Sequence, residues 1–119
     1  MKIYIVRHGE KESEGENPSL TKKGVKQAKH LAKRLKGIKF HEFYCSELNR
    51  SKQTAEIVSK IIKIKPKIKS FLNEYEGYDL KRAKSKWKVK ERRRHSSLIS
   101  FIDKITKNQN KERNILIIA

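Results

Sequence analysis

Two short clusters in this sequence carry side chains that suit phosphate chemistry. Arg7-His8-Gly9-Glu10 follows directly after an apolar run, and Arg50 lies within the polar segment 46–55. A neutral imidazole can attack phosphorus, and a guanidinium can hold phosphate oxygens through two parallel hydrogen bonds. Gly9 would let the backbone approach a ligand closely. The first cluster alone could equally be an ordinary exposed turn, so its meaning depends on the elements that position it.

The apolar residues alternate between strand and helix signals along the chain. Strands are expected over residues 3–6, 43–46, 68–72 and 114–119, and helices over 21–35, 50–62 and, as one or two pieces, 80–107. This order predicts an α/β fold with a mostly parallel sheet and helices on both faces. Ligands of such folds bind at the carboxyl ends of the strands, where both clusters lie.

Helix boundaries support this placement of the two clusters. Thr21 is an expected N-cap and Gly37 an expected stop of the first helix, and Pro66 follows the second helix. Arg50 falls where the second helix begins, and a helix N-terminus attracts anions through its free N–H groups and its dipole. In the last helix, we expect Leu98, Ile99, Ile102 and Ile105 to form the buried stripe.

Three motifs together resemble a known family. They are Arg7-His8-Gly9, then Leu20-Thr21-Lys22-Lys23-Gly24-Val25-Lys26-Gln27-Ala28, then Ser46-Glu47-Leu48-Asn49-Arg50-Ser51-Lys52-Gln53-Thr54-Ala55. The chain thereby resembles the histidine phosphatase superfamily, also called phosphoglycerate-mutase-like, over residues 1 to about 75.

The resemblance implies a role for each matching residue. His8 would accept the phosphoryl group as a phosphohistidine, and Arg7 and Arg50 would hold the phosphate. Glu74 is the expected proton donor to the leaving oxygen, with Glu76 as the alternative. Neither a metal nor another cofactor is implied, since two guanidinium groups can stabilise the charge of the transferring phosphoryl group.

One family residue is missing from these 119 residues. The family has a second His-Gly pair a few residues beyond the strand expected at 115–118, and this sequence stops at Ala119. His30, His41 and His95 are expected at the surface and do not replace that histidine. We therefore expect a C-terminally truncated domain, a fragment rather than a naturally short relative, whose last strand leaves an unpaired sheet edge.

Length and composition set the broad class. The 119 residues suit one domain, 1–119, and the net charge of +18 is spread over the whole chain. The charge favours an anionic substrate as a diffuse field, whereas a nucleic-acid partner is not expected, because no aromatic series interleaves the basic residues. Cys45 is the sole cysteine and is expected to be buried. With no apolar stretch long enough for a bilayer, we expect a cytoplasmic protein without a membrane partner.

The function predicted from these features is a metal-independent phosphatase that acts on phosphorylated small molecules or peptides through phospho-His8. The brief segments 10–20 and 72–96 leave little material for a lid, which favours a phosphatase over a phosphoglycerate-type mutase, because a mutase must enclose its intermediate. The mutase remains one alternative. A non-catalytic relative that binds phosphate or a polyanion is the other.

Overall fold

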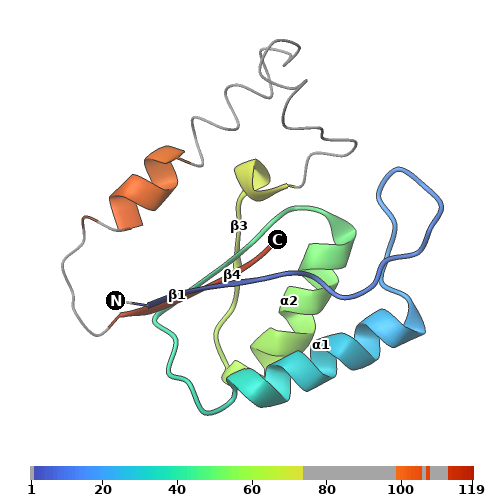
Figure 1. Ribbon diagram of the computed structural model, residues 1–119, viewed down its shortest axis with the longest axis horizontal. Coiled ribbons are helices and arrows are strands. Elements are labelled where there is room, and N and C mark those ends of the chain that lie inside the picture. The colour runs from blue at the N-terminus through green and yellow to red at the C-terminus, as the bar shows by residue number, and fades with distance from the viewer. Residues whose placement is uncertain (1, 74–98, 106, 108–112) are drawn as a thin grey trace, which may run out of the picture.

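The computed structural model describes residues 2–73, 99–105, 107 and 113–119. Four strands form one parallel sheet in the order β1-β4-β2-β3. The strands are β1 (Lys2–Val6), β2 (Glu42–Cys45), β3 (Lys67–Ile68) and β4 (Asn114–Ile118); the helices are α1 (Lys22–Leu35), α2 (Asn49–Ile62) and the short 3-10 helix η1 (Ser70–Leu72). The predicted α/β class is confirmed (Figure 1).

The main core lies between one face of the sheet and the two long helices. Thr21 caps α1, since its side-chain oxygen accepts a hydrogen bond from the backbone of Gly24 at 2.9 Å. Small and apolar side chains from α1 and α2 pack onto alternate residues of β2 and β4, and the buried members are Ala32, Leu35, Phe40, Phe43, Cys45, Ala55, Val58, Leu116 and Ile118. This packing fixes α1 and α2 side by side against one face of the sheet (Figure 1).

A helical segment over residues 99–105 packs against the opposite face of the sheet. Ile105 is buried there, and the Phe101 ring meets the Tyr44 ring edge-on with centroids 4.8 Å apart. Helices on both faces were predicted correctly, and of the expected buried stripe Ile105 is confirmed. Ile99 and Ile102 are 50% and 39% exposed, and Phe101 packs inward with Ile105 instead. Leu98 lies outside the described residues.

Strand β4 occupies an inner position of the sheet, between β1 and β2. The prediction that the last strand leaves an unpaired edge is therefore wrong, because this strand is paired along both sides. Among the described residues the two edges are instead β1, where Ile5 is 73% exposed, and β3, where Ile68 is 53% exposed. A short run of four apolar residues indicates a buried strand but does not indicate which strands flank it.

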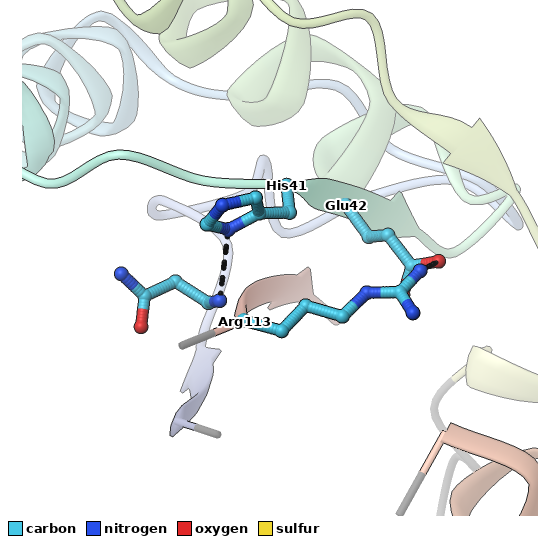
Figure 2. Close-up of polar contacts among 4 residues, drawn as sticks. His41, Glu42 and Arg113 are labelled. Atoms are coloured by element: carbon cyan, nitrogen blue, oxygen red, sulfur yellow. Dashed lines mark hydrogen bonds and ion pairs between the residues drawn. The ribbon is translucent and has the colours of Figure 1, made fainter. Parts of the chain in front are cut away.

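Polar contacts join the amino ends of β2 and β4 (Figure 2). Arg113 forms an ion pair with Glu42, and the backbone N–H of Asn114 donates to Nδ1 of His41 at 3.1 Å. His41 is exposed, as expected, but it also helps to fix the register of the two strands. These contacts lie at the end of the sheet opposite to His8.

Local boundaries differ from the predictions in the third strand and at the helix ends. The strand expected over 68–72 is observed as β3, Lys67–Ile68, after which the chain turns into η1. Helix α2 ends in a left-handed residue, Lys63, with φ 61°, and Gly37 follows α1 without a positive φ. No helix among the described residues has the length and apolar character to cross a membrane.

Candidate active site

His8 lies at the carboxyl end of β1, next to the end of the inner strand. Its backbone N–H donates to the carbonyl of Ala119 at 3.1 Å, and the N–H of Ala119 donates to the carbonyl of Val6 at 3.1 Å. The sheet therefore sets the position of His8 before any side chain does. His8 is only 9% exposed, so the imidazole sits in a largely dry setting.

Arg50 reaches the same point from the start of α2. Its side chain is 1% exposed, and its Nε donates to Nε2 of His8 at 3.2 Å. A guanidinium held away from water interacts more strongly with an anion than an exposed one does. The first turn of α2 adds the positive end of the helix dipole, although the N–H groups of Asn49 and Ser51 already donate to Asn17 and Leu48. The predicted convergence of His8 and Arg50 is thus present in the structure.

Two hydrogen bonds define the protonation of the His8 ring. Nδ1 lies 2.6 Å from the carbonyl oxygen of Gly9, and a carbonyl can only accept. Nε2 accepts from Arg50, which can only donate. Both bonds are satisfied together only by a neutral ring that carries its proton on Nδ1. The unprotonated nitrogen, Nε2, therefore faces the guanidinium, and its lone pair would become available to phosphorus once the Arg50 N–H turns to a phosphate oxygen.

Gly9 is required by the packing of α1. A Cβ at Gly9 would lie 2.4 Å from the carbonyl oxygen of Gly24, and a Cβ at Gly24 would lie 2.1 Å from that of Glu10. Neither glycine can therefore accept a side chain without moving backbone. The close approach expected of Gly9 is thus an approach of strand end to helix, in addition to any approach to a ligand.

Side chains from both helices hold the loop that follows His8. Gln27 accepts from the N–H of Glu10 at 2.8 Å, Gln53 accepts from the N–H of Leu20 at 2.7 Å, and Thr54 accepts from the N–H of Gly9 at 3.1 Å. The sequence analysis quoted these residues within motifs but gave them no role. Thr54 stands four residues after Arg50, hence on the same face of α2, and that spacing was the available signal.

The surface beside His8 is hollowed and positively charged. One hollow of about 450 Å³ is lined by Arg7, His8, Gly9, Glu10, Lys11 and Gln27. A neighbouring hollow of about 240 Å³ shares Arg7, His8, Gly9 and Gln27 and continues over Leu31 of α1. Arg7 is exposed and lines both hollows, which suits a residue expected to hold phosphate.

The remaining predicted residues are either outside the described part of the chain or distant from His8. Glu74, its alternative Glu76, and His95 fall outside the described residues. The residue before Glu74 is placed: Asn73 is buried and accepts from the backbone N–H of Glu47 at 2.9 Å. His30 is exposed on α1, as expected. Cys45 is fully buried, and this burial raises the pKa of its thiol to about 11, which makes it unsuited to nucleophilic chemistry.

Comparison with known proteins identifies the class. The sequence profile of the Histidine phosphatase superfamily (branch 1) matches residues 3–119. The chain therefore belongs to the histidine phosphatase superfamily. Because the match covers almost the whole sequence, the motif-based resemblance over residues 1 to about 75 is extended to the final strand.

Individual relatives include both phosphatases and mutases. The chain is 41% identical over 68 residues to a 2,3-bisphosphoglycerate-dependent phosphoglycerate mutase of Thermoplasma acidophilum, with 50% of this chain and 34% of that protein covered. It is 35% identical over 81 residues to the adenosylcobalamin/alpha-ribazole phosphatase of Escherichia coli K12, with 62% and 40% covered. The matched segments thus span little more than a third of these curated relatives.

Solved structures share the fold. An alpha-ribazole phosphatase from Shigella flexneri superposes with a TM-score of 0.72 at 23% identity, over 100% of this chain and 73% of that one. A phosphoglycerate mutase from Bacillus anthracis superposes with a TM-score of 0.71 at 22% identity, over 98% and 73%. At these identities the likeness concerns the fold, which phosphatases and a mutase share.

Proposed function

We propose that this chain carries the nucleophile of a metal-independent phosphatase that hydrolyses phosphomonoesters through a phosphohistidine on His8. The observation that carries the proposal is the pair of hydrogen bonds on the His8 ring, which leaves Nε2 unprotonated beside the buried guanidinium of Arg50. A nitrogen lone pair next to a fixed cation is what attack on a phosphate dianion requires. The family membership supports the reaction class.

The proposed reaction has two steps. In the first, Nε2 of His8 forms a bond to phosphorus while the ester P–O bond breaks, and the leaving oxygen takes a proton from a carboxylic acid. In the second, water attacks phosphorus, the P–N bond breaks, and the carboxylate takes the proton of the water. Arg7 and Arg50 hold the phosphoryl oxygens in both steps and offset their charge. We assign this proton to Glu74, with Glu76 as the alternative, because two hydrogen bonds hold Asn73, the residue before Glu74, against Glu47.

The substrate class that we propose is a phosphorylated small molecule or peptide, and the location is the cytoplasm. The hollow over His8 is open and contains Lys11 in addition to Arg7, which favours an anionic group entering from solvent. Nucleic acid is not part of the proposal. If it were a ligand, binding would weaken steeply with added salt.

A mutase is the second candidate, because the 41% identity to the Thermoplasma mutase matches the likeness to the phosphatases. Incubation with 3-phosphoglycerate separates the two. A mutase would return 2-phosphoglycerate, whereas a phosphatase would release inorganic phosphate.

The test of the proposal is trapping of the phosphoenzyme. Purified protein is mixed with a ³²P-labelled aryl phosphate, quenched in alkali and assayed for acid-labile label, in parallel with steady-state hydrolysis. We expect label and hydrolysis in the original chain, loss of both in His8→Ala, and no change in His30→Ala, whose histidine is exposed on α1. Absence of label and hydrolysis in the original chain would favour the non-catalytic binder, and label that persists in His8→Ala would exclude His8 as the nucleophile.

A further inference from the structure

The carbonyl that holds the His8 ring belongs to a peptide that is itself held. The carbonyl oxygen of Gly9, which receives Nδ1–H of His8, shares one peptide plane with the N–H of Glu10. That N–H donates to Oε1 of Gln27 at 2.8 Å. The planar peptide therefore transmits the position of the Gln27 side chain to the acceptor of the His8 proton. The same bond polarises the peptide and makes its carbonyl a better acceptor.

The preceding peptide, between His8 and Gly9, is held from the other side. Its N–H donates to Oγ1 of Thr54 at 3.1 Å, in a buried setting. The Thr54 hydroxyl hydrogen is committed elsewhere, because Oγ1 donates to the carbonyl of Arg50 at 2.8 Å. Oγ1 is thus left to accept from Gly9. Thr54 ties the His8 turn to the same turn of α2 that carries the Arg50 guanidinium.

Gly9 cannot rotate freely between these two bonds. Its α-carbon lies against the backbone of Gly24, where even a methyl group would meet the carbonyl oxygen at 2.4 Å. A glycine normally gives the chain more freedom than any other residue. Here both peptides that flank Gly9 are hydrogen-bonded to side chains, and Gly24 of α1 packs against the Gly9 α-carbon. The backbone of Gly9 therefore has little rotational freedom, and its carbonyl keeps one direction.

We propose that Thr54 and Gln27 are positioning residues that fix the two peptides of Gly9 and so hold His8 with its proton on Nδ1 and Nε2 directed to the phosphate. The inference deepens the proposed function and rests on it for its catalytic meaning. Neither side chain is assigned contact with the reacting atoms.

The consequence of losing either bond has a definite sign. A histidine side chain free in water prefers to carry its neutral proton on Nε2, and the hydrogen bond at the other nitrogen decides which form a protein selects. If the Gly9 carbonyl turns away, the ring shifts toward the form protonated on Nε2. That nitrogen then has no lone pair for phosphorus, and the ring is also less well directed. Misplacement by about 1 Å in such a site costs on the order of 10²-fold in rate.

The variants follow from the contacts. Thr54→Val keeps the shape and removes the hydroxyl, and Thr54→Ser restores it. Gln27→Leu removes the acceptor, and Gln27→Glu keeps an oxygen in that place. Gln53→Leu is the matched control, because it removes an equivalent bond from a helix glutamine to the same loop, at Leu20, without touching a peptide of Gly9.

Two readouts are measured on each variant. The first is the ¹⁵N imidazole spectrum of His8, assigned by comparison with His8→Gln, which reports the protonated nitrogen and needs no turnover. The second is the rate of phosphohistidine formation, with kcat and KM for an aryl phosphate. We expect Thr54→Val and Gln27→Leu to mix in the Nε2-protonated form and to lower kcat on the order of 10²-fold with KM unchanged. Thr54→Ser, Gln27→Glu and Gln53→Leu should keep the original spectrum.

The outcomes separate the two proposals. The positioning inference is overturned, whatever the activity, if His8 of the original chain carries its proton on Nε2. It is also overturned if the spectra of Thr54→Val and Gln27→Leu do not differ from the spectrum of the original chain. If the spectrum responds as expected but no phosphohistidine forms, the proposed function fails and the positioning of the ring stands. If Thr54→Val does not fold, as judged by circular dichroism, the Gln27 pair decides the question.

Discussion

The contact between Gly24 and Glu10 offers a direct test of how α1 holds the loop after His8. A Cβ placed on Gly24 would lie 2.1 Å from the carbonyl oxygen of Glu10 and 2.9 Å from its nitrogen. Real Cβ contacts essentially never fall below 3.0 Å, so Gly24→Ala must push helix and loop apart by about 0.9 Å. The neighbour is backbone, and it cannot rotate away as a flexible side chain would.

The cost of that displacement can be worked from the bonds it strains. The Glu10 carbonyl accepts from the N–H of Thr21 at 2.9 Å, and the Glu10 N–H donates to Gln27 at 2.8 Å. If the displacement breaks these hydrogen bonds, each one lost costs about 1 kcal/mol net. If the bonds are kept, the steric overlap itself costs about 1–3 kcal/mol. Alanine is better than glycine in a helix by up to about 1 kcal/mol. The free energy of unfolding should therefore fall by about 1–2 kcal/mol.

The assay is urea unfolding followed by circular dichroism, with Gly37→Ala as the matched control. A Cβ at Gly37 meets nothing within 4 Å, and Gly37 has no positive φ, so alanine there should be neutral or stabilising by up to about 1 kcal/mol. Gly24→Ala should also slow phosphohistidine formation, because the Gly9 carbonyl lies in the peptide that moves. A Gly24→Ala protein as stable as the original chain would refute the packing argument.

Two further predictions concern single residues away from the site. Lys63 ends α2 with φ 61°, so Lys63→Gly should raise the free energy of unfolding by about 0.5–1 kcal/mol, whereas Lys60→Gly inside the helix should lower it by about 1 kcal/mol; the urea midpoint of each variant checks this. Burial raises the pKa of Cys45 from 9.0 to about 11, so alkylation by iodoacetamide at pH 8 should be about 100-fold slower in the folded protein than in urea. Because the folded state holds the thiol proton more tightly, this group should stabilise the fold fully below pH 9 and lose up to about 3 kcal/mol as pH rises through 11, a loss that Cys45→Ala should not show in alkaline unfolding curves. Equal alkylation rates in both states would contradict the burial of the thiol.

The sequence was sufficient to predict the two long helices, the strands before and between them, and the meeting of His8 with Arg50. The main strands are short runs of apolar residues followed by a polar turn, and each long helix has apolar residues at helical spacing. Both patterns can therefore be recognised in the sequence. His8 and Arg50 were placed together because residues that follow parallel strands share one edge of the sheet. Their contact at 3.2 Å confirms that step.

The order of the strands was not available from the same signals. Parallel strands joined by helical crossovers can be arranged in several ways, and the apolar run from Ile115 to Ile118 reads the same in the middle of a sheet as beside its edge. The short strand β3 shows a related difficulty. Apolar residues continue through Leu72, but pairing stops at Ile68, where the chain leaves the sheet edge and its next residues turn into η1.

The motifs of this family combine two kinds of residue, and sequence reasoning identified only one of them. For side chains such as those of His8 and Arg50, the residue type alone indicates which chemistry they can perform. Gln27, Gln53 and Thr54 are uncharged and common on helix surfaces, so their types give no indication of a role. Their role lies in which backbone N–H each one meets, and that depends on how α1 and α2 cross the ends of the strands. His8, the nucleophile that we propose, is thus held by a loop whose shape depends on two helices. Substitutions that leave every charged residue in place should therefore still change the protonation of His8.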